Sequence, residues 1–269
     1  MIKMVATDID GTILDWSLGG FTPAVKSCIN NLTKSGIKVV LVTGRMHESA
    51  KVMADELELK TPIVSYQGGM IKENNENGEV YYRKDLDITK AKEIIQWARK
   101  NKIHINLYID DILYVEEDNE TVKQYTGVRY VNYRVCSFDD LDIKNVNKIL
   151  AIDYNDADKV SRWVEYLSQK YPDLYIVKST PYFCEISNKD AKKSYAVEFL
   201  CKKWNIKKEE VLTIGDQNND IELLKAGGIK VAMGNGTPEL KECADFITDT
   251  VQNDGFVKAV EKFILNPVR

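Results

Sequence analysis

Two aspartates, Asp8 and Asp10, directly follow an apolar stretch at residues 2–6. In an extended chain, residues i and i+2 point to the same side, so the two carboxylates are expected to lie together just past the end of a strand. Such a pair repels itself unless a cation or a proton lies between the charges. The spacing therefore predicts a metal site, provided that other acidic residues reach the same place.

A second group of acidic and amide side chains follows another apolar stretch, VLTIG. Asp216, Asn219 and Asp220 occupy the loop and the first helical turn behind it. If the two strands are parallel neighbours, Asp8, Asp10 and Asp216 meet at one edge of the sheet. Each aspartate alone is more often a turn or cap residue, but this set of oxygen ligands suits a hard cation such as Mg²⁺.

Alternating strands and helices place these residues. Thr43 and Gly44 end a second apolar strand, as Asp8 ends the first, and ligands of parallel α/β sheets bind at the carboxyl ends of the strands. Continuous apolar strands between helices indicate a parallel sheet that helices cover on both faces. The first part of the chain predicts strands at 2–6, 37–43 and 63–65 and helices at about 22–36 and 47–57.

The middle of the chain has a different pattern, and the last part returns to the first. An Asn77-Gly78 turn between two short extended segments predicts a hairpin at about 70–84. The middle section also predicts strands on either side of residues 110–111 and at 148–154, 174–178 and 182–187, with helices around 91–98 and 156–170. The last part predicts strands at 211–216, 229–233 and 246–248, with helices at about 190–204 and 218–226, after Pro238 and near the end of the chain.

This order predicts an α/β fold in which both ends of the chain build one core, residues 1–82 and 189–269, around an inserted α+β domain at 83–188. The net charge of −4, with lysines scattered among acids, argues against a nucleic-acid partner. No apolar run approaches the roughly 18 residues of a membrane span. The five cysteines form no CxxC pair and are typical of reduced thiols, so a cytoplasmic location is expected. No protein partner is evident.

Four motifs, in order along the chain, resemble those of the haloacid dehalogenase superfamily. They are DIDGT at 8–12, TGR at 43–45, a lysine near 193 and GDQNND at 215–220. The segments EISNKDAKK, AGGIKVAMGNGTPELKECADFIT and NDGFVKAV further resemble the Cof-type phosphatases of this superfamily, which carry a large α/β cap of type IIB. The resemblance covers essentially the whole chain. It implies a Rossmann-like parallel core with helices on both faces, an inserted α+β cap, and phosphatase activity.

The resemblance also implies catalytic roles for the acids. Asp8 would attack phosphorus and form an aspartyl-phosphate, which is a known use of a carboxylate in covalent catalysis. Asp10 would protonate the leaving alcohol and then deprotonate the attacking water. The carboxylates of Asp8 and Asp216 and the backbone carbonyl of Asp10 would hold Mg²⁺, and Asp220 would support these metal ligands.

The resemblance assigns the phosphate oxygens to a second set of groups: the Thr43 hydroxyl, the backbone amides of Ile9 and Gly44, Asn219 and one lysine. Three lysines crowd into SNKDAKKSYAV, and the spacing of the family favours Lys193 over Lys192.

The sequence departs from the usual pattern of the Cof-type phosphatases at a few places. Asp190 and Ser194 stand where glycines are usual, and Gln67 and Val251 stand where asparagines are expected. Other candidates have structural explanations. His47, at a helix start, and His104, in a strand, are not expected to contact substrate, and four aromatic residues of the insert are expected to be core residues: Tyr108, Tyr114, Trp163 and Tyr182.

The function that fits best is a Mg²⁺-dependent phosphatase of small phosphorylated metabolites, such as sugar phosphates or phosphorylated cofactors. A phosphomutase or phosphotransferase would share the aspartyl-phosphate and differ in where the phosphoryl group goes. A receiver-like module that only holds phosphate and Mg²⁺ is a different class, but the insert argues against a single compact domain. A dehalogenase is disfavoured because it needs neither a metal nor a proton donor, whereas Asp10 and Asp216 provide for both. A glycosyltransferase with a DxD motif is disfavoured because it would leave GDQNND unexplained.

Overall fold

The two ends of the chain together form one parallel sheet. In the computed structural model, which describes residues 1–127 and 131–265, its strands pair in the order β14-β13-β12-β1-β2. Thr7 of β1 lies opposite Ile214 of β12 on one side and Leu41 of β2 on the other. The loops that follow these strands therefore meet at one edge. The strands are β1 (Met4–Thr7), β2 (Lys38–Leu41), β12 (Val211–Gly215), β13 (Ile229–Ala232) and β14 (Phe246–Ile247).

Helices cover both faces of this sheet, because its strands carry apolar side chains on both sides. Val5 packs in the cluster that contains residues of α1, α2 and α9, whereas Met4 and Ala6 pack with α6 and α7. Thr22 caps α1 by accepting a hydrogen bond from the backbone of Val25. The helices are α1 (Pro23–Lys34), α2 (His47–Glu56), α6 (Lys193–Trp204), α7 (Ile221–Lys225), α8 (Pro238–Glu242) and α9 (Gly255–Val260).

A small antiparallel sheet extends the core beside β2. Its strands are β3 (Ile63–Ser65), β4 (Met70–Lys72) and β5 (Val80–Arg83), and β4 and β5 form the hairpin that the sequence predicts. The backbone amide of Thr43 donates to the carbonyl of Val64, and β3 therefore runs parallel to the end of β2 and beside it.

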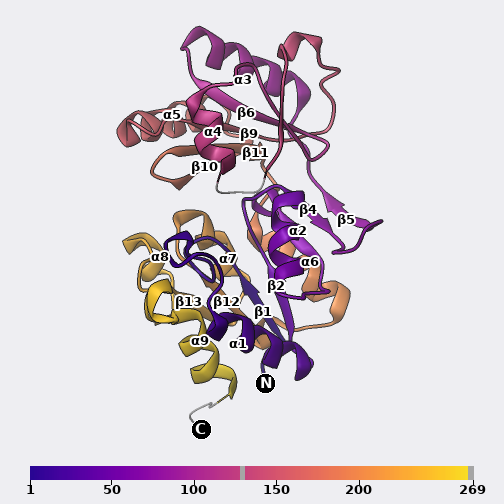
Figure 1. Ribbon diagram of the computed structural model, residues 1–269, viewed down its shortest axis with the longest axis vertical. Coiled ribbons are helices and arrows are strands. Elements are labelled where there is room, and N and C mark those ends of the chain that lie inside the picture. Colours follow the sequence, from indigo (N-terminus) through magenta and orange to yellow (C-terminus); the bar gives the residue numbers. More distant parts are fainter. Residues whose placement is uncertain (128–130, 266–269) are drawn as a thin grey trace.

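The middle of the chain forms a separate six-stranded sheet in the order β10-β11-β9-β6-β7-β8, with only β7 and β8 parallel. We call this sheet with the α-helices that accompany it (residues 88–188) the cap, and the remainder the core. Figure 1 shows the cap stacked on the core, with both termini at the opposite end of the core. The elements are α3 (Ile88–Lys100), β6 (His104–Ile109), β7 (Ile112–Val115), α4 (Glu120–Gly127), β8 (Tyr133–Val135), β9 (Val146–Ile152), α5 (Ala157–Lys170), β10 (Leu174–Thr180) and β11 (Phe183–Asn188).

The two faces of the cap sheet have different partners. Helices α3 and α5 pack on one face around Ile149 and Ile186. On the other face, Tyr108, Leu150 and Phe183 share a buried cluster with residues of α4 and with Met46, Tyr66 and Met70 of the core. The cap therefore presents a partly apolar sheet face to the core. This arrangement confirms the predicted fold class of a parallel α/β core with an α+β cap.

The structure also differs from the expectations. Helix α4 and strand β8 were not predicted, because α4 is short and buries only Val122 and Tyr125. Tyr108 and Trp163 are buried, as expected, and Tyr114 is partly buried. The expectation for Tyr182 is wrong: its side chain is 39% exposed, because it lies in the tight turn between β10 and β11. Within the described residues, no helix is both long enough and apolar enough to cross a membrane.

Candidate active site

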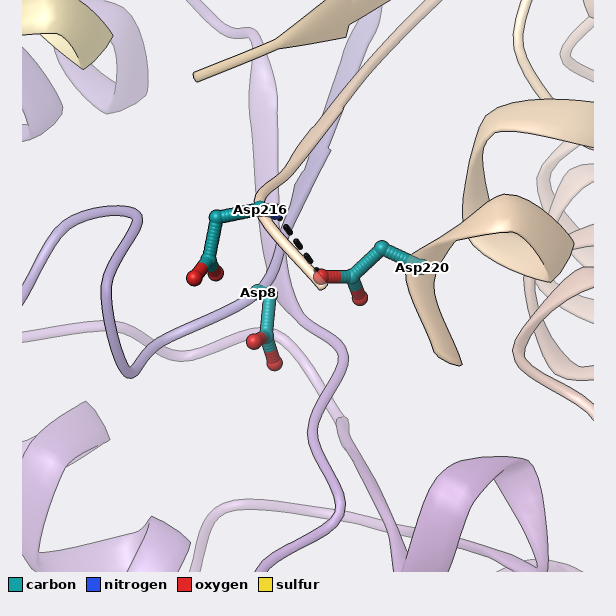
Figure 2. A group of neighbouring side chains, drawn as sticks. All are labelled: Asp8, Asp216 and Asp220. Carbon is teal, nitrogen blue, oxygen red and sulfur yellow. Dashed lines mark hydrogen bonds between the residues drawn. The ribbon is translucent and has the colours of Figure 1, made fainter. Parts of the chain in front are cut away.

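Three buried aspartates meet at the carboxyl edge of the parallel sheet. Asp8 follows β1, Asp216 follows β12, and Asp220 ends the short turn Asn218–Asp220 behind Asp216. Each offers a carboxylate oxygen, and these oxygens all lie within 4.8 Å of one another. Figure 2 shows the three side chains converging from these separate segments. The structure thus brings Asp8 and Asp216 together, although they lie 208 positions apart in the sequence.

Neighbouring groups fix the orientation of Asp216 and Asp220. Asp216 accepts hydrogen bonds from the Thr12 hydroxyl and the Gln217 amide, both at 2.9 Å. Oδ2 of Asp220 accepts from the backbone amides of Asp216, at 2.9 Å, and Gln217, at 3.1 Å. Asp220 therefore ties the loop together, while Asp216 is held facing Asp8.

Lys193 joins the cluster from the first turn of α6. Its side chain is 1% exposed, and Nζ donates to Asp8 at 2.9 Å and to Asp220 at 2.6 Å. Lys192 lies elsewhere, with its Nζ 5.9 Å from the ring centre of Tyr175 and 5.5 Å from that of Tyr195. Of these two lysines, Lys193 is the one at the acid cluster.

The electrostatics of the cluster favour a cation. Burial, together with repulsion from Asp220, raises the pKa of Asp8 well above its ordinary value, although Lys193 acts in the opposite direction. Burial and Asp220 likewise raise the pKa of Asp216 to about 7. Burial would lower the pKa of Lys193, but Asp220 and Asp8 outweigh it and raise this pKa. One ammonium group does not balance three buried carboxylates, and an all-oxygen donor set fits Mg²⁺.

The backbone next to Asp8 is shaped to let Asp216 approach. Gly11 has φ +76°, and a Cβ at this position would lie 2.3 Å from Oδ2 of Asp216. Glycine adopts this φ without strain, whereas other residues seldom do. The turn after Asp10 therefore requires glycine both for its conformation and for the space that the carboxylate occupies.

Asp10 lies beside the cluster rather than in it. Its side chain is 42% exposed and is paired with the buried Arg45, whose Nε and Nη2 donate to the two carboxylate oxygens at 2.7 and 2.6 Å. Nη1 of Arg45 donates to Ser49 at 2.9 Å. Arg45 thus holds both carboxylate oxygens of Asp10 through two hydrogen bonds, an arrangement that we call the Arg45 fork. Ile9, between the two aspartates, directs its side chain into the core.

The predicted phosphate-binding groups surround the cluster. The Thr43 hydroxyl oxygen accepts from the backbone of Arg45 at 3.2 Å, which leaves its own proton to donate. Asn219 donates to Oε1 of Gln67 at 3.0 Å. Nε2 of Gln67 is a buried donor without a hydrogen-bond partner among the described residues, and a Cβ on Gly44 would lie 2.4 Å from it. A buried, unpaired donor beside Gly44 suits an anion.

A cavity of about 280 Å³ separates these groups from the cap. Its floor consists of core residues at the sheet edge, including Asp8, Thr43 and Asp216. Its roof comes from α4, β9, β10, β11 and the turn between the last two strands. The roof residues are Tyr125, Lys148, Ser179, Thr180, Pro181, Phe183 and Glu185.

Comparison with known proteins decides the family. The family model described as haloacid dehalogenase-like hydrolase matches residues 5–260 of the chain. The chain belongs to this family. The predicted resemblance is therefore confirmed, and the chain is an enzyme of the hydrolase class.

Individual relatives of this haloacid dehalogenase-like hydrolase match over nearly their full length. Phosphatase YwpJ of Bacillus subtilis is 26% identical, covering 94% of this chain and 97% of its own. From the same organism, 5-amino-6-(5-phospho-D-ribitylamino)uracil phosphatase YcsE is 28% identical, covering 98% and 96%. The crystal structure of TM0651 from Thermotoga maritima is 32% identical, with a TM-score of 0.81 and 97% of each chain covered.

Several residues of this hydrolase's cavity were not singled out from the sequence. Lys148 and Glu185 form a buried ion pair in the roof, with Nζ 2.7 Å from Oε2. Each is the one charged residue of its strand, β9 (VNKILAI) and β11 (FCEISN), and this is a signal that the sequence does contain. Tyr125 gave no such signal, because it lies on the unpredicted helix α4.

Proposed function

We propose that this hydrolase is a Mg²⁺-dependent phosphatase that acts on small phosphorylated metabolites through an aspartyl-phosphate on Asp8. One observation carries the proposal: the Asp8 carboxylate, paired with Lys193 and beside Asp216, faces a cavity between core and cap. A buried carboxylate with a cationic partner and a site for a second cation is equipped to meet a phosphate dianion.

In the first step, an oxygen of Asp8 attacks phosphorus, and the bond from phosphorus to the leaving alcohol breaks. Lys193 orients the nucleophile by binding one of its oxygens, and its charge favours the ionised form. Asp8, Asp216 and the Asp10 carbonyl are the groups proposed to hold Mg²⁺. When bound there, the cation neutralises charge on the phosphate oxygens and lowers the pKa values of the carboxylates.

The proton of the reaction is assigned to Asp10. In the first step it protonates the oxygen of the leaving alcohol; in the second it accepts a proton from the water that attacks the aspartyl-phosphate and releases phosphate. The half-exposed position of Asp10 beside the cavity suits exchange with both alcohol and water. Arg45 stabilises its ionised form, which is the form that acts as a base in the second step.

The phosphate oxygens are assigned to the Thr43 hydroxyl, the Ile9 and Gly44 amides, Asn219 and Lys193, with Asp220 supporting the metal ligands. Gln67 joins this set, since its buried Nε2 lines the cavity beside Gly44. The glutamine that replaces the expected asparagine therefore serves the same anion.

The size of the cavity supports a small substrate. A volume of about 280 Å³ lies just below the roughly 300–1,000 Å³ of pockets for drug-sized ligands. Relatives that are named phosphatases match over nearly the whole chain, one of them named for 5-amino-6-(5-phospho-D-ribitylamino)uracil. Sugar phosphates and small phosphorylated cofactors are the substrate classes that fit.

Release of inorganic phosphate tests the proposal. The purified protein is incubated with p-nitrophenyl phosphate and with a panel of phosphorylated metabolites, with Mg²⁺ or with EDTA, alongside Asp8→Asn. We expect Mg²⁺-dependent phosphate release by the wild type and none above background with EDTA or Asp8→Asn. Transfer to a second organic group without free phosphate would indicate a phosphomutase or phosphotransferase. Turnover that persists in Asp8→Asn would overturn the mechanism, and phosphate binding without turnover would indicate a receiver-like module.

A further inference from the structure

Two side chains of the cap bind one short segment of the core, residues 44–48. Nζ of Lys148 donates to the carbonyl oxygen of Gly44 at 2.8 Å. The carboxylate of Asp111 accepts from the backbone amides of His47, at 2.9 Å, and Glu48, at 3.2 Å. The segment follows directly on Thr43, and it contains Gly44, whose amide is assigned to phosphate, and Arg45, which fixes Asp10.

The Lys148 contact is built into the interior of the cap. Lys148 lies on β9 and is almost fully buried, with Nζ 5.0 Å from the centre of the Tyr108 ring. Glu185 on β11 pairs with it, and the Ser179 hydroxyl donates to the other oxygen of Glu185 at 2.9 Å. A buried ammonium needs such partners to offset its lost hydration. Lys148 lies on the side of the cap sheet that faces the cavity, and its contact in the core is the Gly44 carbonyl.

The Asp111 contact completes a helix that the core leaves uncapped. Met46 is the N-cap residue of α2, and its side chain makes no capping hydrogen bond in the described structure. Asp111, in the β6–β7 turn of the cap, supplies the missing acceptor. Asn147 fixes this turn by accepting from the Asp111 amide at 3.0 Å, and the Tyr66 hydroxyl of the core donates to the Asp111 carboxylate. An acid at a helix N-terminus stabilises the first turn of that helix.

We propose that Lys148 and Asp111 are positioning residues that couple the seating of the cap to the formation of the phosphate site. When the cap is seated, they fix the 44–48 segment, and with it the Thr43 hydroxyl, the Gly44 amide and the Arg45 fork on Asp10. When the cap lifts away, the Gly44 carbonyl loses its hydrogen-bond donor, and the first turn of α2 loses the Asp111 carboxylate that accepts from its amides. Because linkage is reciprocal, phosphate binding then favours the seated cap. The inference rests on the proposed function of the same site.

The test compares Asp111→Ala with Asp156→Ala as a matched control. Asp156 is the N-cap residue of α5 and accepts from the Lys159 amide at 2.8 Å. Its removal therefore takes away a helix-capping hydrogen bond that does not involve the 44–48 segment. Affinity for inorganic phosphate is measured by calorimetry in the presence of Mg²⁺, with KM and kcat for p-nitrophenyl phosphate. We expect Asp111→Ala to raise both Kd and KM by about fivefold to tenfold. Asp111→Asn should restore most of the affinity, because asparagine also caps helices.

Lys148→Met provides the second arm, with the exposed Lys144→Met as its control. Lys148→Met should weaken phosphate binding in the same way, while Lys144→Met should not. If Lys148→Met does not fold because Glu185 is left unpaired, the double variant Lys148→Met/Glu185→Met removes both charges and should show the same loss. Phosphate Kd and KM of Asp111→Ala equal to those of Asp156→Ala would overturn the inference. Phosphate binding by a wild type that lacks turnover would refute the proposed function, and the Kd comparison would still decide the inference.

Discussion

Lys193 donates a hydrogen bond from Nζ to Oδ1 of Asp8 at 2.9 Å, across 185 positions of sequence. The same ammonium donates to Asp220 at 2.6 Å. This contact joins the first turn of α6 to the end of β1, and together with the Thr12–Asp216 hydrogen bond it links the two ends of the chain at the acid cluster.

Replacing Lys193 by methionine should damage both stability and activity. Removing one partner of a buried ion pair costs about 3–5 kcal/mol, because the remaining charges are left uncompensated. Loss of a positioned cation at a phosphoryl-transfer site should slow turnover by about a hundredfold or more. The free energy of unfolding from urea titration and kcat/KM for p-nitrophenyl phosphate measure the two effects.

Lys192→Met is the matched control for Lys193→Met. Lys192 contacts tyrosine rings rather than the acid cluster, so its loss should change kcat/KM by less than about threefold. Equal losses in the two variants would contradict the assignment of Lys193.

Stability without metal should fall with pH, and Mg²⁺ should reverse this fall. The folded protein keeps a proton on Asp216 between the ordinary pKa of 3.8 and about 7, whereas the unfolded chain has lost it. The folded state binds more protons in this window, so the free energy of unfolding decreases as pH rises through it. Mg²⁺ should therefore raise the Tm more at pH 8 than at pH 5, by several degrees at saturation.

Asp216→Asn isolates this effect. The variant removes the carboxylate whose ionisation is unfavourable, so without Mg²⁺ it should match or exceed the wild-type Tm at pH 8. Mg²⁺ should stabilise it little at any pH. A Mg²⁺-induced rise in Tm that is the same in the wild type and in Asp216→Asn would show that the cation binds elsewhere.

Sequence patterns predicted most of the sheet edge, because that part depends on regular elements. Apolar strands that alternate with helices imply parallel order, and parallel order places the residue after each strand at one edge. This reasoning brought Asp8 together with Asp216, and it placed Thr43 and Gly44 beside them. It also identified the hairpin of β4 and β5 from a single Asn-Gly turn.

The contacts between core and cap could not be predicted in the same way. Asp111 caps a helix whose own N-cap residue is Met46, 65 positions earlier, and nothing in the local sequence marks such a pair. These contacts arise from the docking of two sheets, which side-chain periodicity does not encode.

The role of Asp10 predicts a dependence on the leaving group. Nitrophenolate leaves without a proton, whereas an alkoxide needs one, so Asp10→Asn should slow alkyl phosphates more than p-nitrophenyl phosphate. The loss for an alkyl phosphate should be about a hundredfold or more, the range typical of a general acid. Steady-state kcat/KM for both substrates gives the comparison. An equal loss for both would mean that Asp10 does not donate the proton.

Gly11→Ala should weaken Mg²⁺ binding at the acid cluster, in addition to lowering stability through its positive φ. The substitution places a Cβ 2.3 Å from Oδ2 of Asp216 at φ +76°, whereas Gly19, at φ +78°, has no heavy atom within 4 Å of its Cβ position. Both alanine variants should lose about 1–2 kcal/mol through the positive φ. Only Gly11→Ala should also lose Mg²⁺-dependent stabilisation, as thermal melts with and without Mg²⁺ would show. Matching Mg²⁺ responses in the two variants would argue against a metal ligand at Asp216.

The aspartyl-phosphate mechanism requires a phosphoryl group on Asp8 itself, and this group can be detected. The protein is mixed with p-nitrophenyl phosphate, whose leaving group needs no proton, and Mg²⁺, quenched in acid within milliseconds, digested, and mapped by mass spectrometry. We expect one added phosphoryl group on Asp8 in the peptide that contains DIDGT, in the wild type and more strongly in Asp10→Asn. Steady release of phosphate with no such modification on Asp8 in either protein would contradict it.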